Sequence, residues 1–79
     1  MITIDEIKSA IKHLYETNPN IRVNIRFTRP KIVLDGVRAV IKAVYPNIFI
    51  IEECEGGYPR SHSVQYTDVL TRQVEILEI

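Results

Sequence analysis

The sequence of 79 residues contains one cysteine, two histidines and three glycines, and each scarcity excludes a class of chemistry. A lone Cys54 cannot form an internal disulfide, which is typical of proteins of a reducing compartment. Cys54, His13 and His62 lie in separate segments, without the spacing of zinc ligands. Gly56-Gly57 precedes Tyr58-Pro59 instead of a lysine and a helix, so it does not form a phosphate-binding loop. We therefore expect neither a metal nor a cofactor.

The sequence also lacks long apolar runs and an excess of charge of either sign. No run approaches the roughly 20 apolar residues of a membrane span, and the segment 1–5 lacks the features of a signal peptide. Ten Lys and Arg balance ten Asp and Glu, so the chain as a whole has no field that favours nucleic acid or anionic membranes. However, residues 1–42 carry eight basic and four acidic side chains, and residues 43–79 carry two and six. We expect a cytoplasmic protein that does not enter a membrane.

Enzyme signatures are absent as well. The one arrangement that resembles a nucleophile and a base is Cys54 with His62, which a hairpin across residues 55–60 would bring near each other. The mere presence of a thiol and an imidazole is weak evidence, because an ordinary, partly buried thiol explains Cys54 equally well. The sequence therefore predicts a protein that is not an enzyme.

The first segment has the apolar spacing of a helix. Ile4, Ile7, Ile11 and Leu14 recur three or four residues apart and form one stripe. Thr3, followed three residues later by Glu6, is a capping-box pattern, and Asn18-Pro19-Asn20 ends the helix. This pattern predicts a helix at about residues 4–16.

From Ile21 the apolar period changes from that of a helix to the alternation of a strand. A continuous apolar run, Ile48 to Ile51, is typical of a strand buried on both faces. The segment 32–44 is ambiguous: Asp35-Gly36 forms either a two-residue hairpin turn or a bulge in one bent strand, and its apolar spacing also fits a helix. We favour the bent strand because β-branched residues dominate it. The predicted strands lie at about residues 21–27, 32–44, 48–54, 61–66 and 72–78.

These elements predict one mainly β (α+β) domain over residues 1–79. Its expected architecture is an N-terminal helix followed by a small five-stranded antiparallel barrel of the SH3-like or Sm-like type, which would leave few exposed edges. In its last part, Asp68 is expected to cap a single turn, Val69 to Thr71. Val74 and Ile76 are expected to close the barrel.

One group of side chains suggests a binding surface. Arg22 and Arg26 share a face of the first strand, because alternate residues of a strand point the same way. The adjoining loop and strand add further cations, which give a candidate partner or nucleic-acid face of Arg22, Arg26, Arg29, Lys31 and Arg38. Solvation, a protein partner or nucleic acid would each explain this face. Pairing of copies through exposed strand edges is another interpretation.

Two linked motifs carry a family resemblance. Tyr45-Pro46-Asn47-Ile48-Phe49-Ile50-Ile51 and the run from Tyr66 to Ile76 resemble the Veg family of small bacterial proteins. That family has a Tyr-Pro-x-x-Phe-Val-Val strand followed at similar separation by Tyr-Ser/Thr-Asp-Val-Leu-Thr-x-x-Val-Glu. The chain departs from the family at Thr28-Arg29-Pro30-Lys31, where a Gly-Arg-Lys/Arg loop is usual, and at Ala39, where a glycine is usual. It therefore resembles a divergent member.

The resemblance implies a function that composition and spacing do not. Veg proteins are associated with stimulating biofilm formation, through relief of a transcriptional repressor of matrix genes. The implied activity is that of a cytoplasmic, non-enzymatic regulator that binds a protein partner. The family has no catalytic residues to transfer to this sequence. A nucleic-acid-binding small barrel that uses the basic strand face is the alternative.

Overall fold

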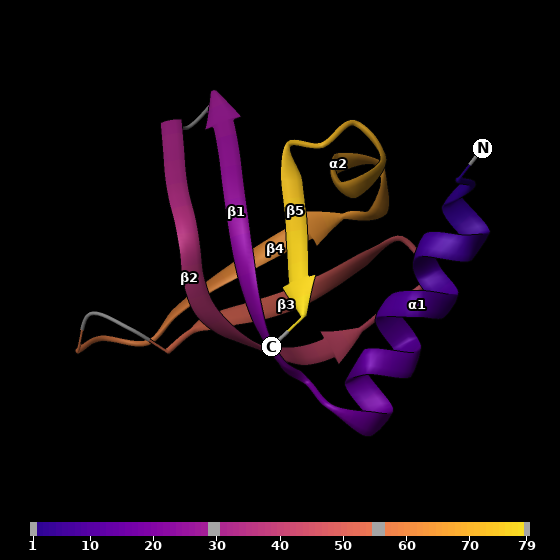
Figure 1. Cartoon of the computed structure of the whole chain (residues 1–79), viewed down its shortest axis with the longest axis horizontal. Coiled ribbons are helices and arrows are strands. Elements are labelled where there is room, and N and C mark those ends of the chain that lie inside the picture. The colour runs from indigo at the N-terminus through magenta and orange to yellow at the C-terminus, as the bar shows by residue number, and fades with distance from the viewer. Residues whose placement is uncertain (1, 29–30, 55–56, 79) are drawn as a thin grey trace.

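The computed structural model describes residues 2–28, 31–54 and 57–78. One helix precedes five antiparallel strands of a single sheet, and a short helix lies between the last two strands (Figure 1). This arrangement confirms the predicted class, because most of its secondary-structure elements are strands. The last strand begins at Val74, two residues later than expected. The elements are α1 (Ile4–Thr17), β1 (Asn20–Thr28), β2 (Lys31–Val44), β3 (Ile48–Glu53), β4 (Arg60–Gln65), α2 (Tyr66–Leu70) and β5 (Val74–Glu78).

The amino-terminal helix α1 begins and ends where its sequence signals stand. The Thr3 hydroxyl oxygen accepts a hydrogen bond from the Glu6 backbone N–H at 3.2 Å, which satisfies one of the free donors at the helix start. Its apolar stripe buries Ile7 and Ile11. The helix packs beside α2 and against β2, on one side of the curved sheet (Figure 1).

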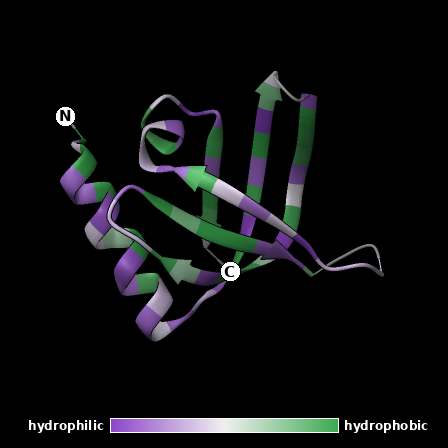
Figure 2. Ribbon diagram, turned by 180° about the vertical axis from the view of Figure 1, so that it is seen from behind, coloured by the Kyte–Doolittle hydropathy of each residue, from purple (hydrophilic) through white to green (hydrophobic). Residues whose placement is uncertain are grey.

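The alternation of β1 divides the sheet into a core face and an outer face. Hydrophobic and hydrophilic bands alternate along this strand in Figure 2. Ile21, Val23 and Ile25 are fully buried, whereas Arg22 and Asn24 between them point to the outer face. The core is completed by apolar residues from every other element: Ile7, Ile11, Ala39, Ile41, Phe49, Ile51, Val64, Tyr66 and Val74.

The long strand β2 contains a bulge, which resolves the ambiguity of residues 32–44. Val23 pairs with Val37 and Ile25 pairs with Leu34, so β2 has one extra residue between these pairs. Gly36 lies there with a φ of +61°, a conformation that glycine adopts without steric cost. The hairpin and helix interpretations of Asp35-Gly36 are therefore wrong, and the single bent strand is confirmed.

The sheet is curved but does not close into a barrel. Its strand order is β4-β3-β2-β1-β5, so β4 and β5 are its edges. The central strand is thus β2. The β3 run Ile48 to Ile51 has its buried residues, Phe49 and Ile51, on one face and half-buried residues on the other. The expectation of a closed barrel with few edges is wrong, although the order is consistent with SH3-like and Sm-like sheets.

The connection from β4 to β5 leads the chain from one edge of the sheet to the other. The helix α2 and a left-handed residue, Arg72 with a φ of +64°, separate the ends of the two strands. The Gln73 carbonyl then accepts a hydrogen bond from the Arg26 N–H at 2.8 Å, and β5 pairs with β1. Val74 and Ile76 therefore extend the sheet at its β1 side and do not join β4.

Asp68 stabilises α2 in a different way from that predicted. The helix starts at Tyr66, so Asp68 is its third residue and not the cap of a turn over 69–71. Its carboxylate accepts a hydrogen bond from the Gln65 backbone N–H at 3.0 Å. A carboxylate at this position satisfies a free donor and interacts favourably with the positive end of the helix dipole.

Candidate partner-binding groove

The predicted basic face is only partly assembled. Arg22 lies opposite Arg38 across the β1–β2 pair, and Arg26 lies farther along the same outer face, where its side chain is exposed. Lys31 is exposed at the start of β2. Arg29 lies outside the described residues. The structure thus brings together four of the five predicted cations on the outer side of the β1–β2 hairpin.

One of these cations has a structural role. The Arg22 guanidinium Nη1 donates to the Gly36 carbonyl at 3.1 Å, and the Gly36 N–H donates to the Asn24 side-chain oxygen at 2.7 Å. Both backbone groups belong to the β2 bulge, where the regular ladder is interrupted. Arg22 and Asn24 therefore satisfy the polar groups of the bulge, and Arg22 is less available to an external anion.

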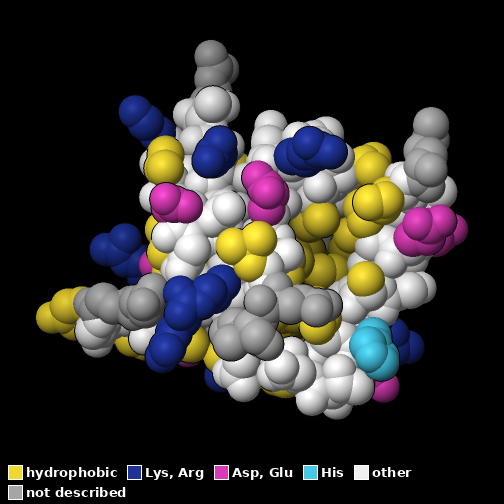
Figure 3. Space-filling model, in the orientation of Figure 1, with side chains coloured by type: hydrophobic (Ala, Val, Ile, Leu, Met, Phe, Trp, Pro, Cys, Tyr) yellow, Lys and Arg dark blue, Asp and Glu magenta, His cyan; other side chains and the backbone are white. Residues whose placement is uncertain are grey.

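Acidic side chains also interrupt this face. In Figure 3, dark blue cations alternate with magenta carboxylates over the strands and do not form one continuous field. Asp35 is exposed on β2, and Glu75 of β5 lies opposite Asn24 of β1. A polyanion that followed β1 would pass both carboxylates. The face is therefore mixed in charge.

The Cys54 and His62 side chains do not form a nucleophile and base. The His62 Nε2 lies 2.5 Å from the Glu53 carboxylate, and both side chains are mostly buried. Cys54 is exposed, and its Sγ lies 3.8 Å from the Glu52 carbonyl oxygen. Within ranges 2–28, 31–54 and 57–78, no group of three or more His, Cys, Asp or Glu side chains could hold a metal ion.

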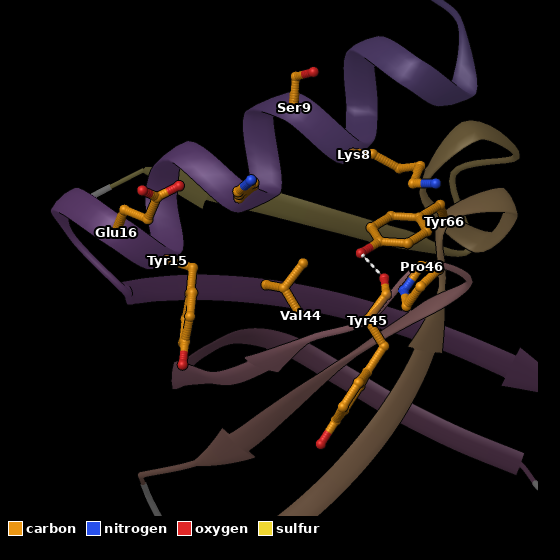
Figure 4. Close-up of a pocket in the computed structure, with 9 residues that line it drawn as sticks. Lys8, Ser9, Tyr15, Glu16, Val44, Tyr45, Pro46 and Tyr66 are labelled. Carbon is orange, nitrogen blue, oxygen red and sulfur yellow. Dashed lines mark hydrogen bonds between the residues drawn. The ribbon is translucent and has the colours of Figure 1, made fainter.

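A cleft that sequence reasoning missed lies between α1 and the turn from β2 to β3. It has a volume of about 470 Å³ (Figure 4). The helix contributes polar and aromatic side chains, and the turn contributes Tyr45-Pro46. Its lining residues are Lys8, Ser9, Lys12, Tyr15, Glu16, Val44, Tyr45, Pro46 and Tyr66.

Tyr66 lies at the bottom of this cleft, where contacts on several sides hold its side chain in place. Its hydroxyl donates to the Tyr45 carbonyl at 2.7 Å, and its ring centroid lies 5.4 Å from that of Phe49 in the core. The Lys8 ammonium lies 5.7 Å from the same ring centroid, within range of a cation–π interaction. Only 2% of Tyr66 is exposed, and burial raises the pKa of its hydroxyl. One side chain thus joins α1, α2, β3 and the turn.

Two other tyrosines of the cleft face solvent. Tyr15 is 41% exposed and Tyr45 is 53% exposed. Figure 4 shows their rings on either side of Val44, with the hydroxyl groups directed the same way. The result is a short apolar floor between two aromatic walls. Such a site accepts an apolar side chain and offers hydroxyl groups at its rim.

A second cavity extends the cleft along the helix. It has a volume of about 370 Å³ and shares Lys8, Pro46 and Tyr66 with the first. Ile4 and Thr67 lie at its far end. The two cavities are neighbours beside α1, between Tyr15 and Ile4, and we call them together the α1 groove.

The apolar periodicity of the sequence does not indicate this groove, because the helix residues that line it are mostly polar. Lys8, Lys12 and Glu16 lie off the apolar stripe of α1, and the spacing of that stripe assigns them to solvent. Tyr45-Pro46 stands out in the sequence only as part of the family motif. A usable signal was the spacing itself, because Lys8, Lys12 and Glu16 recur every four residues and share one helix face with Tyr15. The sequence did not show that Tyr45 and Tyr66 meet this face.

The comparison with family models identifies a family over nearly the whole chain. A family model described as Biofilm formation stimulator VEG matches residues 2–77. No curated protein matches the sequence. No helix in the described part of the chain has the length and apolar character that a membrane crossing requires. Because the match covers nearly the whole sequence, the chain belongs to the Veg family.

Proposed function

We propose that this chain is a Veg-type regulator of biofilm formation that acts by binding a protein partner in the α1 groove. Family membership supports the regulatory role. The resemblance implies that this binding leads to relief of a transcriptional repressor of matrix genes. The observation that carries the proposal is the pair of exposed tyrosines, Tyr15 and Tyr45, on either side of Val44.

The chemistry of tyrosine favours a protein partner at this site. A tyrosine ring offers a large apolar area with few rotatable bonds, so little conformational entropy is lost when a partner covers it. Its hydroxyl keeps a polar contact at the rim, and tyrosine is enriched in protein interfaces for these reasons. The groove also rests on Tyr66, which the core holds in place. The site is therefore preorganised, which lowers the cost of binding.

The nucleic-acid alternative relies on a different surface. Its cations, Arg22, Arg26, Lys31 and Arg38, lie on the outer face of β1 and β2, where Asp35 and Glu75 interrupt them. Charge reversal at Arg26 therefore separates the two proposals. If the strand face binds nucleic acid, the variant protein is no longer retained on immobilised oligonucleotides. A protein partner bound in the α1 groove is still bound by the variant.

The open edges of β4 and β5 support a second copy of the chain as a further partner. Unpaired edges present free backbone donors and acceptors, which readily pair with another strand. We expect the mass measured by light scattering to rise with protein concentration. A monomer mass at the highest concentration reached contradicts this mode.

Capture from a native lysate tests the proposed site. We expect the double variant Tyr15→Ala, Tyr45→Ala to lose a protein that the wild-type chain retains, because truncation removes both aromatic walls. Both side chains are exposed, and the Tyr45 carbonyl that binds Tyr66 is a backbone group, so the fold is preserved. Captured proteins are identified by mass spectrometry for each variant.

The chain supplies a matched control in Tyr58, which is 81% exposed and lies outside the α1 groove. Tyr58→Ala removes an equally large aromatic side chain and should retain the partner. If the double variant captures the same protein as the wild type, the groove is not the partner site.

A further inference from the structure

We infer that the α1 groove binds an extended acidic segment, in which one apolar side chain and two carboxylates occupy alternate positions, with the apolar side chain at one end. This inference rests on the proposed function and names the chemistry of the partner. The Tyr15 end of the groove provides an apolar floor at Val44, and the middle provides two ammonium groups, Lys8 and Lys12. The two kinds of contact are separated along the helix.

The spacing of these contacts matches an extended chain. At a rise of about 1.5 Å per residue, Lys12 lies about 4.5 Å along α1 from Tyr15, and Lys8 lies about 6 Å farther. Side chains on the same side of an extended segment recur about every 6.6 Å. Because lysine side chains are flexible, the three contacts are reached by alternate residues. A segment of about five residues therefore covers them.

The charges of the groove fix which end of the segment is acidic. Glu16 lines the cleft beside Tyr15, and its carboxylate repels a negative group there. Lys8 and Lys12 attract carboxylates at the other positions, and the Lys8 ammonium lies 5.7 Å from the centroid of the Tyr66 ring, which lines both cavities. An apolar residue at the Tyr15 end avoids repulsion by the Glu16 carboxylate, and two carboxylates farther along the segment pair with Lys12 and Lys8. The direction of the bound chain is not constrained by these contacts.

The same charges disfavour a nucleic acid in the groove. Affinity for nucleic acid grows with the number of phosphates that cations neutralise, and the groove offers two lysines before it reaches Glu16. A continuous polyanion would have to pass that carboxylate. A short acidic segment of a protein does not have to do so.

Fluorescence polarisation with labelled synthetic peptides tests the inference. The first probe contains the order leucine, serine, glutamate, serine, glutamate, which places its two carboxylates at alternate positions after the leucine. A second probe contains the same five residues in the reverse order. Comparison peptides place both glutamates directly beside the leucine, or replace them with lysines. We expect one spaced acidic probe to bind more tightly than both comparison peptides, and its affinity to fall as salt is raised.

Variants of the chain locate the contact. Lys8→Glu and Lys12→Glu should each weaken binding of the acidic probe about fivefold to tenfold, since each replaces an exposed attraction with a repulsion. Lys42→Glu is the matched control, because Lys42 is exposed on β2 outside the groove and carries the same charge. The Lys42→Glu variant should bind the acidic probe with the affinity of the wild type.

The outcomes separate this inference from the proposed function. No binding of either spaced probe, equal binding of the comparison peptides, or unchanged affinity in both lysine variants overturns the inference. The inference is also overturned, in favour of nucleic acid, if a single-stranded oligonucleotide binds more tightly than the acidic probes and Lys12→Glu abolishes this binding. If the tyrosine double variant still loses the captured partner in any of these cases, the proposed function stands. Retention of that partner rejects the proposed function itself.

Discussion

Replacing Phe49 with alanine is expected to lower the free energy of unfolding by about 3–5 kcal/mol, the usual cost of truncating a buried phenylalanine. Phe49 is completely buried, pairs with Val44 and Val64 in the neighbouring strands, and packs on the Tyr66 ring. At about 0.05–0.15 kcal/mol per residue, a domain of this size has about 4–12 kcal/mol in total. The variant should therefore lose from about a quarter to all of its free energy of unfolding.

Urea unfolding followed by circular dichroism measures this effect. Tyr58→Ala serves as the comparison, because its side chain is mostly exposed and its loss should change the free energy of unfolding by less than about 0.5 kcal/mol. An unfolding midpoint for Phe49→Ala equal to that of the wild type contradicts the described core.

Replacing Tyr66 with phenylalanine is expected to cost about 1–2 kcal/mol, because the Tyr45 carbonyl loses its hydrogen-bond donor. The ring and its packing on Phe49 remain. The change should also alter the dependence of stability on pH. Burial raises the pKa of the Tyr66 hydroxyl in the folded chain, so the folded state favours the protonated form.

The sign of this pH effect follows from the linkage of protonation to folding. The contribution of Tyr66 is fully present below the ordinary pKa of tyrosine, near 10, and is lost as pH rises through the higher pKa of the folded chain. Urea unfolding at pH 7 and above pH 10 should therefore show a smaller alkaline loss of stability in Tyr66→Phe than in the wild type. An equal loss in both proteins contradicts this role of the buried hydroxyl.

Much of the fold could be predicted because it depends on local patterns. The spacing of Ile7 and Ile11 defines the buried stripe of α1, and Thr3 marks its start. The alternation from Ile21 to Ile25 defines the core face of β1. These signals arise from backbone geometry within a few residues, which the sequence displays directly.

The features that the sequence left open depend on contacts between distant segments. Asp35-Gly36 suits a turn or a bulge equally well, and only pairing with Asn24 and Arg22 of β1 decides between them. Closure of the barrel likewise depends on where the chain goes after Tyr66. Local pattern indicates a turn after Tyr66, but it does not show that β5 pairs with β1 and leaves β4 at the other edge of the sheet.

The candidate site illustrates the same difference. Arg22 and Arg26 share a strand face, as predicted, but the sequence did not show that Arg22 would bind the bulge carbonyl. The α1 groove combines helix positions that periodicity assigns to solvent with a turn about thirty residues away. Nothing in the sequence indicates that the Tyr66 hydroxyl would bind the Tyr45 carbonyl and so fix the turn beside α1.

The most direct test of the account measures biofilm formation by cells in which this chain is the only Veg protein. Biofilm mass is compared among cells expressing the wild type, Tyr58→Ala and the double variant Tyr15→Ala, Tyr45→Ala, at equal protein levels. The account predicts that the wild type and Tyr58→Ala stimulate biofilm formation, while the double variant gives the mass of cells without the protein. Full stimulation by the folded double variant would contradict the claim that the α1 groove carries the function.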